Sequence, residues 1–273
     1  MFKALLLQSW YNLSDVALEK QLARDLMFRR FVGLNLSDSI PDHTTIWRFR
    51  EALKNEQLFD QLLLEIQDQL AQKSLFIQHG SISIIDASVI EAQRCRPNKD
   101  KNGNNTQDQA AGYTSKIFAD GQKKSCYGFK AHLNVDEDGF VKAMKFTNAS
   151  LHDSNIFEEL LQSYDEACTA DGAYLSKKNG KILAQRNIEN LILNRAYRNK
   201  PLSLEEKQNN QKISPIRSIV ERVFGIFKLH YGMRKSRYLG LERNRMRLGL
   251  MCIAYNIKTG LRIFKEMMQY KSA

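Results

Sequence analysis

The sequence predicts a mixed α/β protein in which an all-helical N-terminal domain precedes a mixed sheet flanked by helices. Residues 1–75 contain few β-branched residues, and Leu and Phe recur there at helical spacing, whereas SISIIDASVI from residue 81 has the β-branched composition of a strand. The 273 residues are 43% hydrophobic and 26% charged, a composition that excludes collagen-like and wholly disordered chains.

Two helices are expected at the N-terminus. Ser14 is placed to cap the first helix and Gly33 to end it. The second helix follows a turn and begins within PDHTTIWRFREAL, where hydroxyl groups precede Arg48 and Arg50. Hydroxyls and arginines at a helix start are what a helix-turn-helix element presents to DNA. A small helical bundle whose aromatic residues only pack explains the same pattern equally well.

The remaining elements follow in a recognisable order. The strand is followed by a long polar loop over 94–125, a β-hairpin turning at 136–139, a helix over 154–164 and a strand at EACTAD. A helix from Ser176, a strand ENLILN, a polar linker over 196–216 and two long helices complete the chain. This is the order of a ribonuclease-H-like fold. We therefore predict a helical domain over 1–78, a core over 79–235 and a basic helical segment over 236–273 packed on that core.

The charge is concentrated in the last third of the chain. Residues 1–175 contain 19 basic and 24 acidic residues, and residues 176–273 contain 22 basic and 6 acidic residues, which gives net charges of −5 and +16. Such a polycation attracts nucleic acid, because neutralised phosphates release their counterions. No apolar stretch is long enough to cross a bilayer, and no signal peptide is evident, so we expect a cytoplasmic protein that binds DNA and no membrane.

Three carboxylates are candidates for a metal site. Asp86 closes the first apolar strand, and Asp171 closes the strand CTAD. Glu221 lies in SPIRSIVERVFGIFKLHYG, with Arg217 four residues before it and Lys228 seven after it, so all three project along one helical stripe. Three carboxylates are suited to two Mg²⁺ or Mn²⁺ ions beside a phosphodiester. Taken singly, a strand cap, a turn residue and a helix salt bridge explain them better; together, in this order, they favour the metal site.

Several longer motifs carry a family resemblance. The segments IIDASVIEA, YGFKAHLNVD, TNASLHDSN, ADGAYLS and IRSIVERVFGIFKLHYGMRKSRYLGLERN follow the N-terminal LSDVALEKQLARDLMFRRFVGLNLSDSIPDHTTIWRFR. In this order they resemble transposases of bacterial insertion sequences, of the IS-five family, within the DDE-type ribonuclease-H-like recombinases. Ser214 departs from the pattern, because some relatives carry Tyr at this position. The resemblance also implies that relatives carry more residues before KALLLQSWYNLSD, so a missing N-terminal part is expected.

The resemblance implies that Asp86, Asp171 and Glu221 are the catalytic acids and hold two divalent ions. It implies binding of terminal inverted repeats and target DNA, strand cleavage and strand transfer, and at least a homodimer. The predicted DNA contacts are Arg217, Lys228, Arg234, Lys235, Arg237, Arg48, Arg50 and Lys130. Two alternatives stay open: a truncated or inactive relative that regulates by binding DNA, and a metal-dependent nuclease without strand transfer.

Overall fold

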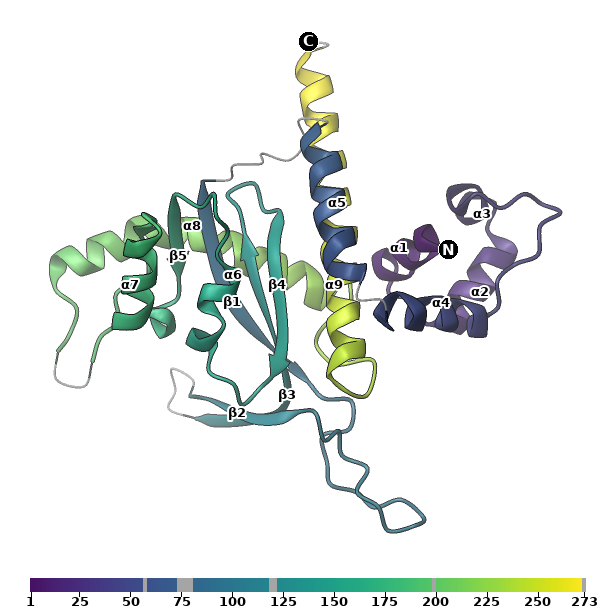
Figure 1. The fold of residues 1–273 in the computed structure, drawn as a ribbon, viewed down its shortest axis with the longest axis horizontal. Helices are drawn as coiled ribbons and strands as arrows, with labels where there is room; N and C mark the ends of the chain where they lie inside the picture. Colours follow the sequence, from purple (N-terminus) through teal and green to yellow (C-terminus); the bar gives the residue numbers. More distant parts are fainter. Residues whose placement is uncertain (56–57, 73–80, 118–121, 198–199, 272–273) are drawn as a thin grey trace. The chain divides into compact units, whose positions relative to one another are not determined.

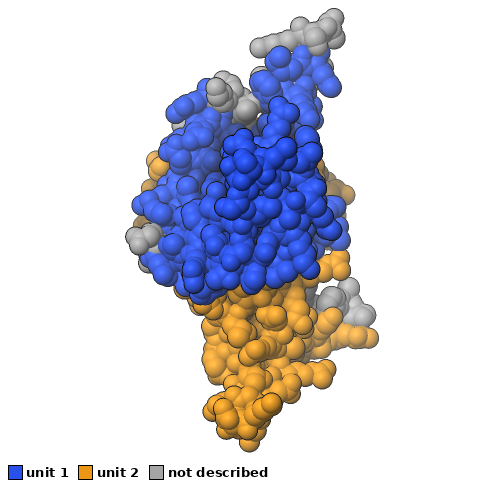
Figure 2. Space-filling model, turned by 90° about the vertical axis from the view of Figure 1, so that its right-hand side faces the viewer, with its two compact units in different colours: residues 1–76, 227–232, 246–273 blue, residues 77–226, 233–245 orange. Residues whose placement is uncertain are grey.

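The structure is a computed structural model that describes residues 1–55, 58–72, 81–117, 122–197 and 200–271. The chain forms two compact units. Unit 1 comprises Met1–Phe76, Phe227–Gly232 and Met246–Ala273, and unit 2 comprises Ile77–Ile226 and Met233–Arg245 (Figure 2). Most of the last helix thus belongs to the unit of the N-terminal helices, although the sequence predicted a separate segment over 236–273. The predicted boundaries at 78 and 235 remain predictions.

Unit 1 consists of helices joined by turns and loops, with no strand among its described residues. Its helices are α1 (Phe2–Trp10), α2 (Asp15–Arg24), α3 (Leu26–Val32), α4 (His43–Asn55), α5 (Leu58–Gln72) and most of α9 (Leu241–Lys271). The side chains of Leu5, Leu18, Leu22 and Ile46 are fully buried and form its core. The Trp10 indole N–H donates to the carbonyl of Ala254 at 2.7 Å, which ties α1 to α9 within this unit.

The first predicted helix is interrupted. Ser14 caps α2 as expected, because its hydroxyl accepts from the backbone N–H three residues later at 3.1 Å. At Asp25 the backbone becomes extended, and its carboxylate accepts from two N–H groups of the next turn and so begins α3. Gly33 ends α3 at a φ of 84°, a conformation that glycine adopts without steric cost.

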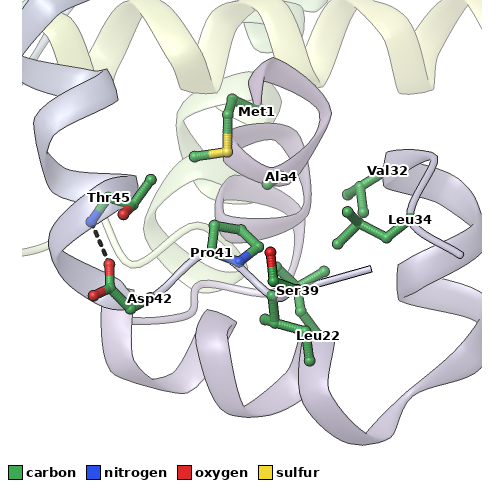
Figure 3. A pocket seen from close by; sticks show the side chains of 10 residues that line it. Met1, Ala4, Leu22, Val32, Leu34, Ser39, Pro41, Asp42 and Thr45 are labelled. Carbon is green, nitrogen blue, oxygen red and sulfur yellow. Dashed lines mark hydrogen bonds between the residues drawn. The ribbon is translucent and has the colours of Figure 1, made fainter. Parts of the chain in front are cut away.

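Unit 1 also contains a cavity of about 530 Å³ beside α1, α2 and the chain that leads into α4 (Figure 3). Its lining is Met1, Ala4, Leu22, Val32, Leu34, Ser39, Ile40, Pro41, Asp42 and Thr45. The Asp42 carboxylate on its wall accepts from the Thr45 N–H at 2.6 Å and thereby caps α4. Among the described residues, no helix has the length and apolar character to span a bilayer.

Unit 2 is built on a six-stranded mixed sheet (Figure 1). Its strands are β1 (Ile82–Glu91), β2 (Gly112–Ile117), β3 (Lys123–Val135), β4 (Val141–Asn148), β5 (Ala167–Ala170) and β6 (Glu189–Asn190). β1 is central, since it pairs antiparallel with β3 and parallel with β5. β5 pairs parallel with β6, and the long β3 also pairs antiparallel with β2 and β4.

Helices cover the sheet of unit 2. The described helical elements are η1 (Asp153–Asn155), α6 (Phe157–Leu160), η2 (Gly172–Tyr174), α7 (Lys177–Gln185) and most of α8 (Leu204–Leu229). Phe157, Leu160 and Leu183 from α6 and α7 form one buried cluster with Ile85 of β1 and Cys168 of β5. This cluster packs against both parallel strands, β1, which contains Asp86, and β5, which ends just before Asp171.

Three expected segments differ from the structure. The polar loop predicted over 94–125 contains β2 and the start of β3, which pair with each other although their sequences show little alternation. The helix predicted over 154–164 is reduced to η1 and α6, and the linker predicted over 196–216 is helical from Leu204. The expected hairpin is confirmed as β3 and β4, where the Asp136 carboxylate accepts from the Phe140 N–H at 2.7 Å.

Candidate active site

Strand pairing places Asp86 and Asp171 side by side. In the parallel pair of β1 and β5, Ile85 is the partner of Ala170, and the two acids are the next residues on each strand. Asp86 remains within β1, whereas Asp171 leaves the sheet and its carboxylate accepts from the Gly172 N–H at 2.7 Å at the start of η2. Asp86 therefore does not end its strand as predicted, but the backbone register still brings the two predicted acids together.

Asp86 lies in a poorly solvated position. Its side chain is only 18% exposed, and burial raises its pKa from 3.8 to about 6. The Arg217 guanidinium opposes this pKa increase, while the carboxylates of Asp171 and Glu221 add to it. Of the three predicted acids, Asp86 is the most buried, since Glu221 is 54% exposed and Asp171 is also exposed.

Arg217 links Glu221 to Asp86. One turn of α8 separates Arg217 from Glu221, and their side chains approach to 2.7 Å (Nη2 to Oε1). The same nitrogen lies 3.7 Å from Asp86 Oδ2, too long for a hydrogen bond but within ion-pair distance. Glu221 is 54% exposed, so its carboxylate reaches solvent. Lys228 lies further along α8, in the part that belongs to unit 1, and the structure does not place it at this site.

The donor set at this site fits a hard divalent cation. Carboxylate oxygens are the ligands that Mg²⁺ prefers, and a desolvated acid beside two other acids is stabilised by added positive charge. Arg217 supplies part of that charge by occupying Glu221 and approaching Asp86. Over the described residues, no three acidic, His or Cys side chains are already gathered as metal ligands. The described residues thus place carboxylate donors near one another without an assembled set of metal ligands, and Arg217 pairs with one of the three predicted acids.

The predicted DNA contacts differ in their exposure to solvent. Arg48, Arg234 and Lys235 are exposed, and Arg237 is half-buried. Arg50 is only 2% exposed, and both terminal nitrogens of its guanidinium contact the Asp15 carboxylate, at 2.6 and 2.7 Å.

Lys130 is also buried. Its ammonium group donates to the carbonyl of Leu151 at 2.8 Å and lies 2.8 Å from Asp153 Oδ1. Arg50 and Lys130 are therefore corrected from DNA contacts to structural cations, because packing takes their charged groups out of solvent.

The sequence did not indicate Tyr174 as part of this site. Its ring is 1% exposed, and its hydroxyl has no hydrogen-bond partner within the part of the chain that the structure describes. Burial raises its pKa, and the carboxylates of Asp153, Asp86 and Asp171 raise it further, so these acids are its charged neighbours. The sequence shows that Tyr174 follows Asp171 by three residues, but only tertiary packing shows where its hydroxyl lies.

The chain is similar to known transposases in sequence and in fold. A family model described as "Transposase DDE domain" matches residues 77–257, and one described as "Transposase domain (DUF772)" matches residues 1–52. The structure described as "piggyBac transposase synaptic complex with hairpin DNA" has a TM-score of 0.51 and 12% identity. The match covers 99% of this chain but 66% of that chain, just under two thirds of its length.

Two Mos1 structures are more distant. The "Mos1 Strand Transfer Complex" and the "pre-cleavage Mos1 transpososome" have TM-scores of 0.25 and identities of 10% and 12%. The matches cover 89% and 92% of this chain and 73% and 74% of the Mos1 chains. Scores this low support no comparison of folds.

These findings decide the fold and the family. The likeness to piggyBac transposase confirms the predicted ribonuclease-H-like mixed sheet with N-terminal helices. Transposases with a DDE domain generally use divalent metal ions, in keeping with the carboxylate donors at this site. The first family model covers well over half of the residues, and the chain therefore belongs to the family of DDE-type transposases.

Proposed function

We propose that this protein binds the ends of an insertion sequence and catalyses metal-dependent DNA strand cleavage and strand transfer. The observation that supports this most directly is the juxtaposition of Asp86 and Asp171 on two parallel strands, with Arg217 between Asp86 and Glu221. Family membership supports a transposase, and the position of the acids supports active chemistry rather than binding alone. Within that family, the motif order favours the IS-five group.

We assign the three acids as ligands of two Mg²⁺ or Mn²⁺ ions. When bound, such ions stabilise charge on a phosphodiester and on the attacking and leaving oxygens. Asp86 would contribute the most buried carboxylate, and its raised pKa disfavours ionisation until positive charge is supplied. Arg217 pairs with Glu221 in the metal-free protein, and a guanidinium released from this pair would offer a cation to a DNA phosphate.

The partners are proposed to be terminal inverted repeats and target DNA. The piggyBac structure is a synaptic complex with DNA, and joining two DNA ends calls for at least two protein copies. Arg234, Lys235 and Arg237 would contact the phosphate backbone, Lys228 would add a further cation from α8, and Arg48 on α4 would contribute to end recognition. We expect this activity in the bacterial cytoplasm.

Two alternatives predict different products. A regulatory relative would bind end DNA and leave it intact, whereas a nuclease would cut it without joining. The protein is therefore incubated with labelled end DNA, chosen from inverted repeats flanking its gene, and with an unlabelled target in Mg²⁺ or Mn²⁺. Cut ends joined to the target are expected. Cut ends without joined product would favour the nuclease, and intact bound DNA would favour the regulator.

Matched variants test the assignment of the acids. Asp86→Asn and Asp171→Asn should each abolish cleavage while DNA binding in EDTA persists, because both remove a proposed metal ligand and preserve side-chain size. Glu189→Gln is the control, since Glu189 is an exposed acid of the same unit. Cleavage by Asp86→Asn at the rate of the parent would exclude the proposed metal site.

A further inference from the structure

The loop between β1 and β2 carries four exposed cations. They are Arg94, Arg96, Lys99 and Lys101. Among the described residues, none of these side chains forms an ion pair or a hydrogen bond. The loop also contains two acids, Asp100 and Asp108, of which Asp108 is only 6% exposed. Figure 1 shows this loop projecting from the end of the sheet in unit 2.

The base of this loop is bonded to a second basic segment, Arg234–Gly240. The Glu91 N–H donates to the carbonyl of Arg234 at 3.1 Å, and the Ser236 N–H donates back to the carbonyl of Glu91 at 2.8 Å. The Gln93 N–H donates to the Ser236 hydroxyl at 2.8 Å. Arg234 and its exposed neighbour Lys235 therefore lie beside the point where the loop leaves β1.

Asp108 fastens the far end of the loop to the same segment. Its Oδ2 accepts from the Gly240 N–H at 2.9 Å, and its own N–H donates to the carbonyl of Arg94 at 3.1 Å. The Tyr127 hydroxyl, from β3, donates to the carbonyl of Asp108 at 2.8 Å. A buried carboxylate with these partners is a structural anchor, because leaving its partners unsatisfied costs free energy. Both ends of the loop are thus held against 234–240.

The two segments together present a concentrated positive charge. Residues 92–111 contain four basic and two acidic residues, and residues 234–240 contain three basic residues and no acidic residue. We propose that the loop 92–111 and the segment 234–240 form one surface, held together by Asp108 and Ser236, that binds the phosphate backbone of duplex DNA. β1 connects this surface directly to Asp86, five residues before Glu91. The inference rests on the proposed function and adds the DNA surface that the catalytic acids would use.

The first experiment removes charge from the loop. Binding of the full chain to a labelled DNA duplex is measured in EDTA over a series of salt concentrations. Arg94→Ala combined with Arg96→Ala should weaken binding and reduce the slope of log K against log salt by about 2, since each phosphate contact contributes about 1 to that slope. The control combines Lys177→Ala with Lys178→Ala, two exposed cations on α7 of the same unit, and should retain the parental slope.

The second experiment tests the anchoring role of Asp108 by asking whether Asp108→Asn raises or lowers the affinity for DNA. Asp108→Asn removes a negative charge, so charge alone predicts tighter binding of DNA. Loss of the anchor predicts the reverse, because an amide retains only one acceptor oxygen and the loop would separate from 234–240. We expect weaker binding of DNA. Circular dichroism should show that the variant is as fully folded as the parent at the assay temperature. Tighter binding by Asp108→Asn would overturn the anchoring role.

The outcomes separate this inference from the proposed function. A parent that binds and cuts end DNA while the Arg94 and Arg96 double variant keeps its affinity and slope would overturn the surface alone. A parent that binds no DNA would overturn both. Vesicles containing phosphatidylserine serve as a second polyanion: if the double variant lost vesicle binding but kept DNA binding, the surface would be assigned to a membrane and the inference would fail.

Discussion

Replacing Asp86 by Asn should stabilise the metal-free protein at neutral pH. The Asp86 carboxyl loses its proton near pH 6 in the folded protein, against 3.8 for an ordinary aspartate. Because the folded-state pKa lies above the unfolded value, the contribution of this carboxyl group to stability is greatest below pH 3.8. That contribution is lost as the pH rises to about 6. At about 1.4 kcal/mol for each pH unit in that window, the ionised carboxylate costs about 3 kcal/mol at neutral pH. Asparagine has the same shape and avoids this cost.

Urea unfolding in EDTA measures the effect. At pH 7.5, Asp86→Asn should raise the free energy of unfolding by about 3 kcal/mol, and at pH 4 the difference should shrink towards zero. Other buried acids titrate equally in parent and variant, so they cancel in the difference. Glu189→Gln, at an exposed acid, should change the free energy by no more than about 0.5 kcal/mol at either pH.

Divalent ions should remove most of this difference in stability. A metal that binds the folded parent at 100 times its dissociation constant adds about 2.7 kcal/mol of stability, whereas a variant without the ligand gains little. Mn²⁺ should therefore raise the unfolding midpoint of the parent more than that of Asp86→Asn. An Asp86→Asn variant no more stable than the parent at pH 7.5 in EDTA would refute the reasoning, because the carboxylate would then be well solvated.

Three further predictions follow from buried or paired charges. In urea unfolding, Asp15→Asn should destabilise unit 1 by about 3 kcal/mol, because it leaves the buried Arg50 without its counter-charge. The control Arg48→Ala, at an exposed residue, should lower the free energy of unfolding by less than about 0.5 kcal/mol. Equal effects of the two variants would contradict the buried ion pair. Asp136→Asn should stabilise the protein above pH 7 and lose that advantage below pH 4, because burial raises the pKa of Asp136 to about 7; a pH-independent difference would count against this. Arg217→Gln should lower the Mn²⁺ concentration needed for half-maximal stabilisation and also slow cleavage, since the guanidinium occupies proposed metal ligands; weaker Mn²⁺ binding would contradict the competition.

Local patterns predicted several elements correctly. Ser14 caps α2 and Gly33 ends α3 because both depend on backbone geometry within a few residues. The β3–β4 hairpin was predictable for the same reason, since its turn is specified by the short segment 136–139. The break at Asp25 was missed because a single capping aspartate inside a helical pattern competes with continuation of the helix.

Burial was the main source of error in the predicted DNA contacts. Arg50 and Arg48 are two residues apart on one helix, and both were predicted to contact DNA. In the structure they lie on opposite faces of α4, so Arg48 is exposed whereas Arg50 is enclosed with Asp15. Lys130 was assigned to DNA for its charge, yet its partners Leu151 and Asp153 come from a distant segment.

The sequence alone predicted most of the order of the elements, the concentration of positive charge and the three candidate acids, because residue type, spacing and periodicity carry that information. The tertiary structure decided which charged side chains lie close to one another. Asp86 and Asp171 become neighbours only through the register of β1 on β5, and Arg217 approaches Asp86 only when α8 packs on the sheet. The pKa of Asp86 likewise depends on burial, which arises from residues far apart in the chain and leaves no local pattern.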